Sequence, residues 1–378
     1  MKNKISEFLQ SRIDAKDFPS AVYLVAEKDE IVLQDALGFA VVKPEKIAAR
    51  IDTIYDLASL TKPLVTGLLC AKLIEKGEIY LDDKIAKYLS SFENDEKRGI
   101  TIENLLTHTS GFPAWKPFYL TENGKYKTEN ILSQIVSEPL INSLNLKVVY
   151  SDFNFITLGF MLEKIHSERL DEIAKKEIFA LLKLQNTFYN PPKGLQKRIA
   201  ASEKGNLFEK QMITERSIES EKSQIQNPKS KIQNRMVWGE VHDGNCYFMN
   251  GVSGHAGLFS TAEGVFKIAQ QFLANQTTLL KPETCKLFRT NYTENLNEAR
   301  SIAFQLAETK DSTASLALSK DSFGHLGFTG TSLWIEPETE RIFILLTNRT
   351  HARELPFINI NPTRRRFHEL ATQVLNEK

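Results

Sequence analysis

Cysteine is scarce in this 378-residue sequence, and its three copies are scattered. Cys70, Cys246 and Cys285 are odd in number and form no C-x-x-C pair, which argues against a disulfide framework and against a zinc or redox site. A long apolar run is also missing. The least polar helix candidate, residues 64–74, is short and is broken by Lys72, so we expect no segment that spans a membrane.

The sequence has no large excess of charge of either sign. Its 48 Lys and Arg residues nearly balance its 47 Asp and Glu residues, which gives a formal net charge of +1. This balance argues against nucleic acid or an anionic membrane as the main partner. The opening "MKNKISEFLQSRI" lacks the apolar core of a signal peptide. We therefore expect a cytoplasmic protein, or a periplasmic one only if the true start lies upstream; the oligomeric state stays open.

Strand patterns occur at both ends of the chain, and helical spacing dominates between them. The runs "AVYLVAE" (21–27) and "EIVLQDA" (30–36) are separated by a short turn and predict a hairpin. Near the other end, "TSLWIEP" (331–337) and "RIFILLTNR" (341–349) predict two more neighbouring strands. This order predicts an α+β fold in which an antiparallel sheet, built from both termini, is flanked by helices.

The middle of the chain is expected to form a second, mostly helical domain inserted into the first. We place the α/β domain at residues 1–75 and 245–378, and the helical domain at 76–244. Within the latter, the stretch at about 215–234 is polar and nearly free of large apolar residues ("ERSIESEKSQIQNPKSKIQ"). Such a composition predicts a disordered surface insertion.

Ser59 and Lys62 form the first candidate for chemistry. Residues three apart share one face of a helix, and Pro63 is tolerated only in a first turn, so the helix should begin near Ser59. A serine hydroxyl needs a neighbouring base to become a nucleophile, and free N–H groups at a helix start can donate to an oxyanion. Lys62 could serve as the base if burial lowers its pKa. A lone Ser-x-x-Lys is common, so the pair gains meaning only with partners.

Two further segments supply partners. Tyr150 and Asp152 lie at the start of a predicted helix, and a phenol beside a lysine can share the proton transfer. In "FGHLGFTGTSLWI", His325 and Gly327 lead into a strand whose edge can lie beside a substrate, and Gly327 permits close approach. The backbone N–H of Phe328 is the second candidate oxyanion donor.

Two other histidines are interpreted as structural. "GHAG" around His255 repeats the G-H-x-G pattern, but it precedes a capped helix rather than a strand. His108 and Ser110 resemble the polar C-terminus of a helix stopped at Gly111. No G-x-S-x-G, H-E-x-x-H or Walker motif is present, and we expect no metal and no cofactor.

Taken together, Ser59-Leu-Thr-Lys62, Tyr150-Ser-Asp152 and His325-Leu-Gly327 resemble the motifs of the serine β-lactamase and penicillin-binding-protein superfamily. The similarity covers nearly the whole chain and is greatest to class C β-lactamases and the esterases and D,D-peptidases built like them. The resemblance implies Ser59 as the nucleophile, Lys62 and Tyr150 as the proton-handling pair, and a site in the cleft between two domains.

Two residues depart from the family pattern. Asp152 stands where the family usually has asparagine, and an ionised aspartate cannot donate a hydrogen bond. Leu326 stands where the third motif usually has threonine, in Lys-Thr-Gly or His-Thr-Gly. In lactamases and peptidases the lysine and threonine of the third motif hold the substrate carboxylate, so their loss here argues against efficient β-lactam hydrolysis. We also expect His325 to change charge near neutral pH and to attract a substrate carboxylate only when protonated.

The sequence therefore predicts a serine hydrolase that acts through an acyl-enzyme on a small ester or a peptide-like amide. A D,D-carboxypeptidase or a β-lactamase is one alternative. A binding protein that keeps the fold without turnover is another, and Asp152 and Leu326 would favour it.

Overall fold

The structure is a computed structural model that describes residues 4–94, 96–120, 127–219, 235–274 and 278–377. Two antiparallel sheets occur in these ranges: a larger one ordered β3-β2-β1-β10-β9-β8-β7 and a smaller one ordered β4-β6-β5. The strands are β1 (Ser20–Glu27), β2 (Glu30–Val41), β3 (Ile47–Ala48), β4 (Tyr55–Asp56), β5 (Phe188–Tyr189), β6 (Leu258–Ser260), β7 (Gln305–Leu306), β8 (Phe323–Leu326), β9 (Ser332–Glu336) and β10 (Arg341–Thr347).

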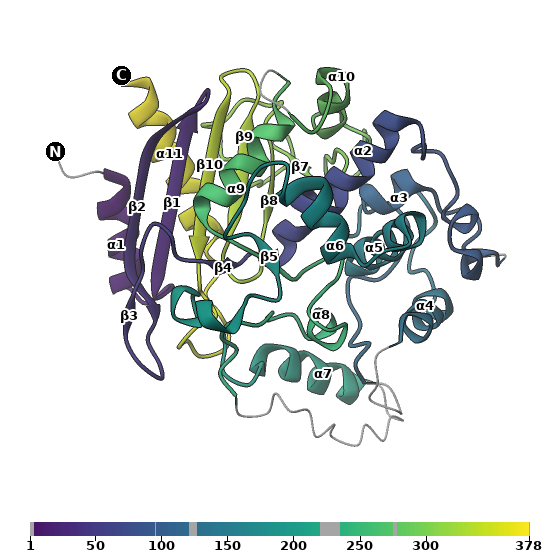
Figure 1. Cartoon of the computed structure of the whole chain (residues 1–378), viewed down its shortest axis with the longest axis horizontal. Coiled ribbons are helices and arrows are strands. Elements are labelled where there is room, and N and C mark those ends of the chain that lie inside the picture. The colour runs from purple at the N-terminus through teal and green to yellow at the C-terminus, as the bar shows by residue number, and fades with distance from the viewer. Residues whose placement is uncertain (1–3, 95, 121–126, 220–234, 275–277, 378) are drawn as a thin grey trace.

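The larger sheet joins the two ends of the chain, as the sequence predicted. The N-terminal hairpin β1–β2 pairs through β1 with β10, with Val22 opposite Leu346. Helices α1 (Lys4–Asp14) and α11 (Asn361–Asn376) cover one face, and α9 (Ala262–Ala269) packs against β1 and β10 on the other (Figure 1). The antiparallel sheet flanked by helices is therefore confirmed.

Both faces of β1 are buried because each supports its own apolar core. Tyr23 and Val25 belong to the cluster under α1 and α11, whereas Val22 and Leu24 belong to the large cluster on the opposite face. Successive strand side chains point to opposite faces, so the run of apolar residues in β1 fits a strand covered by helices on both sides.

Helices fill the space beside the sheet in Figure 1. They are α2 (Leu68–Lys76), α3 (Ile102–Leu106), α4 (Thr128–Ser137), α5 (Asp152–His166), α6 (Leu170–Ala174), α7 (Leu207–Glu219), α8 (Gly244–Phe248) and α10 (Pro282–Cys285). Helix α7 extends five residues into the stretch predicted to be disordered from residue 215; the remainder, residues 220–234, lies outside the described residues.

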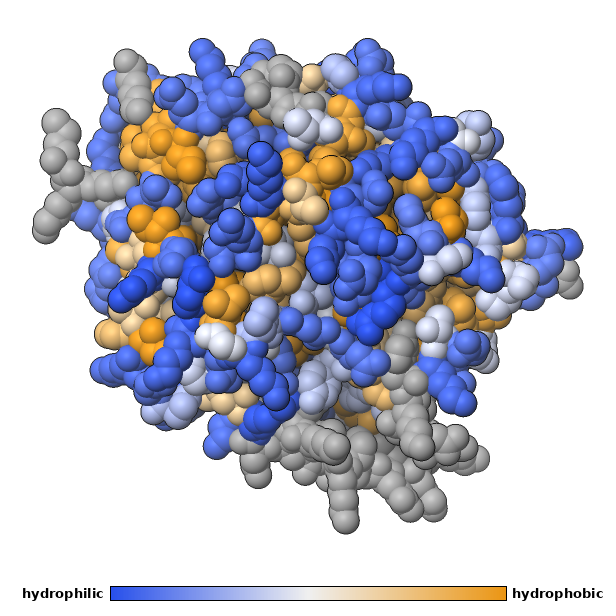
Figure 2. Space-filling view, viewed as in Figure 1, coloured by the Kyte–Doolittle hydropathy of each residue, from blue (hydrophilic) through white to orange (hydrophobic). Residues whose placement is uncertain are grey.

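The face shown in Figure 2 is mostly hydrophilic, with apolar side chains in separate groups between charged ones. Among the described residues, no helix is both long and apolar enough to cross a membrane.

Candidate active site

Ser59 lies at a helix start, as predicted, but the helix does not begin as an α-helix. Ala58–Leu60 form a 3₁₀ turn, Lys62–Gly67 a π-helix, and only then does α2 begin. Pro63 accounts for part of this difference, because it has no N–H to donate to the carbonyl of Ser59. Ala58 has a left-handed φ of 48° and turns the chain sharply from β4 into this segment.

The Lys62 ammonium lies among three acceptors. Nζ donates to Asp152 Oδ1 at 2.7 Å, to Ser59 Oγ at 2.9 Å and to the His255 carbonyl at 3.2 Å. A protonated lysine has three donors and no acceptor, so the surroundings match the charged form.

The pKa of Lys62 follows from the same contacts. Burial by itself lowers the pKa of this fully buried lysine, but the Asp152 carboxylate and Tyr150 together raise it above its ordinary value. Lys62 therefore does not meet the condition, a lowered pKa, under which it could serve as the base. The substitution of aspartate for asparagine at position 152 is the main reason, because it supplies a negative charge in contact with Nζ.

His255 contributes its backbone, not its ring, to Lys62. Its ring lies between Ser253 Oγ (2.7 Å from Nδ1) and Asp243 Oδ1 (2.9 Å from Nε2). Strand β6 begins three residues after His255, and the next helix, α9, is capped by Thr261. The prediction that a capped helix rather than a strand comes next after His255 was therefore wrong, although the buried ring does have structural hydrogen bonds.

Donor atoms of Asp152, Asp243 and His255 lie within 4.8 Å of one another, a spacing that a cation site would need. The Lys62 ammonium already pairs with Asp152, and the His255 ring already donates a hydrogen bond to Asp243. Both carboxylates therefore have partners within the protein. The pKa of Asp243 is about 2, because the partner His255 and a backbone N–H outweigh the effect of burial. We interpret the cluster as the counter-charge of Lys62.

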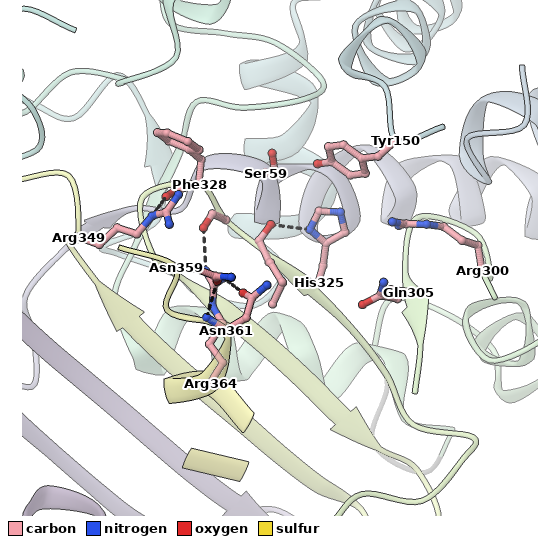
Figure 3. A pocket seen from close by; sticks show the side chains of 12 residues that line it. Ser59, Tyr150, Arg300, Gln305, His325, Phe328, Arg349, Asn359, Asn361 and Arg364 are labelled. Atoms are coloured by element: carbon pink, nitrogen blue, oxygen red, sulfur yellow. Dashed lines mark hydrogen bonds between the residues drawn. The ribbon is translucent and has the colours of Figure 1, made fainter. Parts of the chain in front are cut away.

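Tyr150 faces the same centre. Its ring centroid lies 4.8 Å from Lys62 Nζ and 5.4 Å from the Arg300 guanidinium carbon. The rings of His108 and His325 lie 4.6 Å and 5.8 Å from it. Figure 3 shows the Tyr150 hydroxyl pointing toward Ser59. The structure therefore brings Ser59, Lys62 and Tyr150 together.

His325 is on β8, in the strand itself rather than before it. Nδ1 donates to the Leu326 carbonyl at 2.9 Å, and Nε2 has no partner among the described side chains and backbone. Burial, together with the charges of Arg300 and Lys62, lowers the pKa of His325 well below its ordinary value. The expected charge change near neutral pH is therefore wrong: His325 stays neutral and presents a bare acceptor nitrogen.

Gly327 and Phe328 place the end of β8 against the Ser59 segment. A Cβ at Gly327 would lie 2.5 Å from the Leu57 carbonyl oxygen and 2.0 Å from Thr331 Oγ1, so no side chain fits there. The Phe328 ring packs against Phe208, with centroids 4.6 Å apart. The space beside Gly327 is thus occupied by the Thr331 side chain and the Leu57 backbone of the protein itself, and not by a substrate.

A cavity of about 360 Å³ opens in front of Ser59 (Figure 3). Besides the predicted residues, it is lined by Gln305, Asn359, Asn361 and three arginines, Arg300, Arg349 and Arg364. Sequence reasoning missed this positive charge, because the arginines come from separate segments and form no motif.

Arg364 and Arg366 have different surroundings on α11. The run Arg364–Arg366 by itself would predict an exposed face of the last helix, and Arg366 is exposed and paired with Glu369. Arg364 is buried, however, and donates to the carbonyls of Gly327 and Thr331 at 3.0 and 2.9 Å. It ties α11 to the turn after β8.

A second cavity, of about 270 Å³, lies on the other side of Ser59 and is more apolar. Trp115, Phe208 and Met212 line it together with Glu209 and Asp243. Burial and the charge of Asp243 raise the pKa of Glu209 to about 7. Ser59, Tyr150 and Phe328 line both cavities, so the serine lies between a cationic and an apolar compartment.

Comparison with known proteins supplies the wider context. The family model described as Beta-lactamase matches residues 3–361. A putative D-alanyl-D-alanine carboxypeptidase of Escherichia coli K12 is 30% identical, over 93% of this chain and 82% of its own length.

Solved structures share the fold at low sequence identity. EstCE1, described as a hydrolase with promiscuous acyltransferase activity, superposes with a TM-score of 0.73 at 17% identity, covering 97% of each chain. A class C β-lactamase from Rhodobacter sphaeroides also gives a TM-score of 0.73, at 16% identity, over 99% of this chain and all of its own.

Proposed function

Because this chain belongs to the Beta-lactamase family and is a serine hydrolase, we propose that Ser59 is its nucleophile and forms the acyl-enzyme. The observation that carries the proposal is the 2.9 Å contact between Lys62 Nζ and Ser59 Oγ, at a point that opens onto both cavities. The ammonium donates to Oγ and stabilises the negative charge that develops there.

Tyr150 moves the proton. As Ser59 Oγ bonds to the substrate carbonyl carbon, its proton passes to Tyr150 Oη, and the phenol's own proton passes to the leaving nitrogen or oxygen. Water then attacks the acyl-enzyme by the reverse path, and Ser59 regains its proton. This assignment leaves Lys62 protonated throughout, in keeping with its raised pKa.

The backbone N–H groups of Ser59 and Phe328 hold the oxyanion. Among the described residues, neither N–H donates to another protein group. Gly327 keeps the Phe328 segment against the helix start that carries Ser59. His325 forms part of the cavity wall that faces the substrate. Asp152 supplies the negative charge that balances Lys62.

The cationic cavity favours a substrate whose leaving group carries a carboxylate. Arg300 is buried, and its Nε and Nη1 have no hydrogen-bond partner among the described residues. Arg349 lines the same cavity. These charges can replace the lysine and threonine that the third motif lacks. They support a peptide-like substrate of the kind named for the E. coli relative, a D-alanyl-D-alanine peptide, over a neutral ester.

The test is intact-mass analysis after incubation with a fluorophosphonate, a penicillin and p-nitrophenyl esters, for wild type and Ser59→Ala. We expect adducts and turnover in wild type and neither in the variant. A variant that hydrolyses esters above the chemical background would show that Ser59 is not the nucleophile. A wild type that forms adducts without turnover would favour the binding-protein alternative.

A further inference from the structure

The backbone on both sides of Tyr150 is fixed by the loop that follows α3. Val149 N donates to the His108 carbonyl at 2.9 Å, and Asp152 N donates to the Ala114 carbonyl at 2.9 Å. Ser151 Oγ donates to the Pro113 carbonyl at 2.6 Å. This short segment has no regular secondary structure before α5 begins at Asp152, so these bonds decide where Tyr150 stands.

His108 supplies the remaining contact through its ring. Nδ1 accepts hydrogen bonds from Ser151 N and from Asn154 Nδ2, both at 3.1 Å. The amide of Asn154 is itself oriented, because its Oδ1 accepts from Ser110 Oγ at 2.6 Å. The sequence interpretation of His108 as the polar end of a helix missed this role, since its partners lie more than 40 positions away.

The same contacts determine which tautomer of the His108 imidazole is present. A nitrogen that accepts two N–H bonds carries no proton, so the neutral ring of His108 has its proton on Nε2. The ring is fully buried and packs against Tyr150 and Phe155, with centroids 4.6 and 5.2 Å apart. The residue also adopts a left-handed φ of 61°, an uncommon conformation for a side chain of this size.

We propose that His108 is a positioning residue for Tyr150: its Nδ1 holds the Ser151 N–H and thereby fixes the phenol where proton transfer requires it. The inference rests on the proposed function, because it assigns the purpose of His108 through the role of Tyr150. Ser151 is buried, so its N–H has no water to replace a lost acceptor. Without Nδ1 the segment must shift, and a shift of about 1 Å can cost about 100-fold in rate.

Two substitutions separate the hydrogen bond from the ring. His108→Phe keeps an aromatic ring of similar shape but has no acceptor. His108→Asn loses the ring, keeps an acceptor oxygen near the position of Nδ1, and suits the left-handed backbone. His368→Phe is the matched control. His368 is also buried and also hydrogen-bonded through Nδ1, in its case to the Thr313 carbonyl, but it is on α11 and packs against Trp334 and Phe343.

The measurement is kcat and KM for a p-nitrophenyl ester, with the melting temperature recorded for each variant. We expect His108→Phe to lower kcat about 10- to 100-fold with KM nearly unchanged. His108→Asn should recover most of that loss, and His368→Phe should leave kcat unchanged. If His108→Phe keeps the wild-type kcat, or if His108→Asn is the more damaged variant, the proposal is overturned.

A double-mutant cycle with Tyr150→Phe tests whether His108 acts through the phenol. In the Tyr150→Phe background, adding His108→Phe should have little further effect on acylation of Ser59. An equal loss in both backgrounds would overturn the proposal. If the Tyr150→Phe single variant keeps the wild-type rate, both the proposed role of Tyr150 and the inference about His108 are wrong. If Tyr150→Phe loses activity but the His108 variants keep the wild-type rate, only the inference about His108 is wrong.

Discussion

Lys62 and Asp152 form a buried ion pair beside Ser59, with Nζ 2.7 Å from Oδ1. The lysine side chain is fully buried and the aspartate side chain is 16% exposed, so the pair is only weakly screened by water. The pair favours the charged form of Lys62, which in the proposed mechanism stabilises negative charge on Ser59 rather than removing its proton.

The first prediction concerns the alkaline limb of the pH–rate profile. Asp152→Asn removes the negative charge that raises the pKa of Lys62, so the effect of burial takes over and that pKa falls. If the ammonium form is the active one, activity should be lost at a lower pH in the variant. The measurement is kcat/KM between about pH 7 and pH 11, a range that brackets the ordinary lysine pKa of about 10.4. An alkaline limb that does not move would contradict the role given to the pair.

The second prediction concerns stability. Asp152→Leu leaves the Lys62 charge buried without a partner, which should lower the free energy of unfolding at pH 7 by about 3–5 kcal/mol. The pKa of Lys62 is higher in the folded protein than in the unfolded chain. The pair's contribution to the free energy of unfolding is therefore fully present below the unfolded-chain pKa of the lysine, and it is lost as the pH rises through the folded-state pKa. Urea unfolding of both proteins at pH 7 and above pH 10 checks this. The difference between them should shrink at high pH; a difference that grows would be evidence against the ion pair as its source.

The third prediction is that His325 does not sense pH. Its pKa is lowered well below 6.5 by burial and by Arg300 and Lys62, so it remains neutral as the solution is acidified toward about pH 5.5. The ratio of kcat/KM for a carboxylate ester to that for a matched neutral ester should not improve from pH 8 down to that value. A ratio that rises on acidification, and loses its pH dependence in His325→Gln, would show that the imidazole does become charged.

The fourth prediction concerns the carboxylate preference. Arg300→Gln removes the buried guanidinium from the cationic cavity, and a charged hydrogen bond is worth about 1.5–3 kcal/mol. We expect kcat/KM to fall roughly 10- to 100-fold for a carboxylate-bearing substrate, with little change for its methyl ester. Arg366→Gln, on the exposed face of α11, is the control and should affect neither substrate. Equal losses for both substrates would point to a general distortion of the site instead.

The fifth prediction separates two neighbouring arginines. Arg364→Leu removes the charged donor to the carbonyls of Gly327 and Thr331, which then keep only their backbone donors, Gly330 N and Gly327 N respectively. The free energy of unfolding should fall by about 2–4 kcal/mol, since a hydrogen bond to a charged group contributes about 1.5–3 kcal/mol. Arg366→Leu should change it by less than about 0.5 kcal/mol, as is usual for an exposed position. Similar losses in the two variants would mean that Arg364 is not tied to the β8 turn.

Local patterns in the sequence were enough to predict the sheet and the helix start that carries Ser59. The apolar run in β1 and its turn to β2 predicted a hairpin, because strand pairing across a short turn is a local property. Pro63 placed the helix start beside Ser59 for the same reason, since the missing N–H acts within one turn.

Only the tertiary structure decided the charge states of the site and the residues that surround it. Lys62 is protonated because Asp152, 90 positions away, reaches its ammonium, and His325 is neutral because burial and Arg300 act on it together. His108 and Arg364 look like ordinary polar residues in their own segments. Their roles arise from acceptors and donors that folding brings from distant parts of the chain, and a pKa or a buried hydrogen bond depends on those neighbours in space rather than on neighbours in sequence.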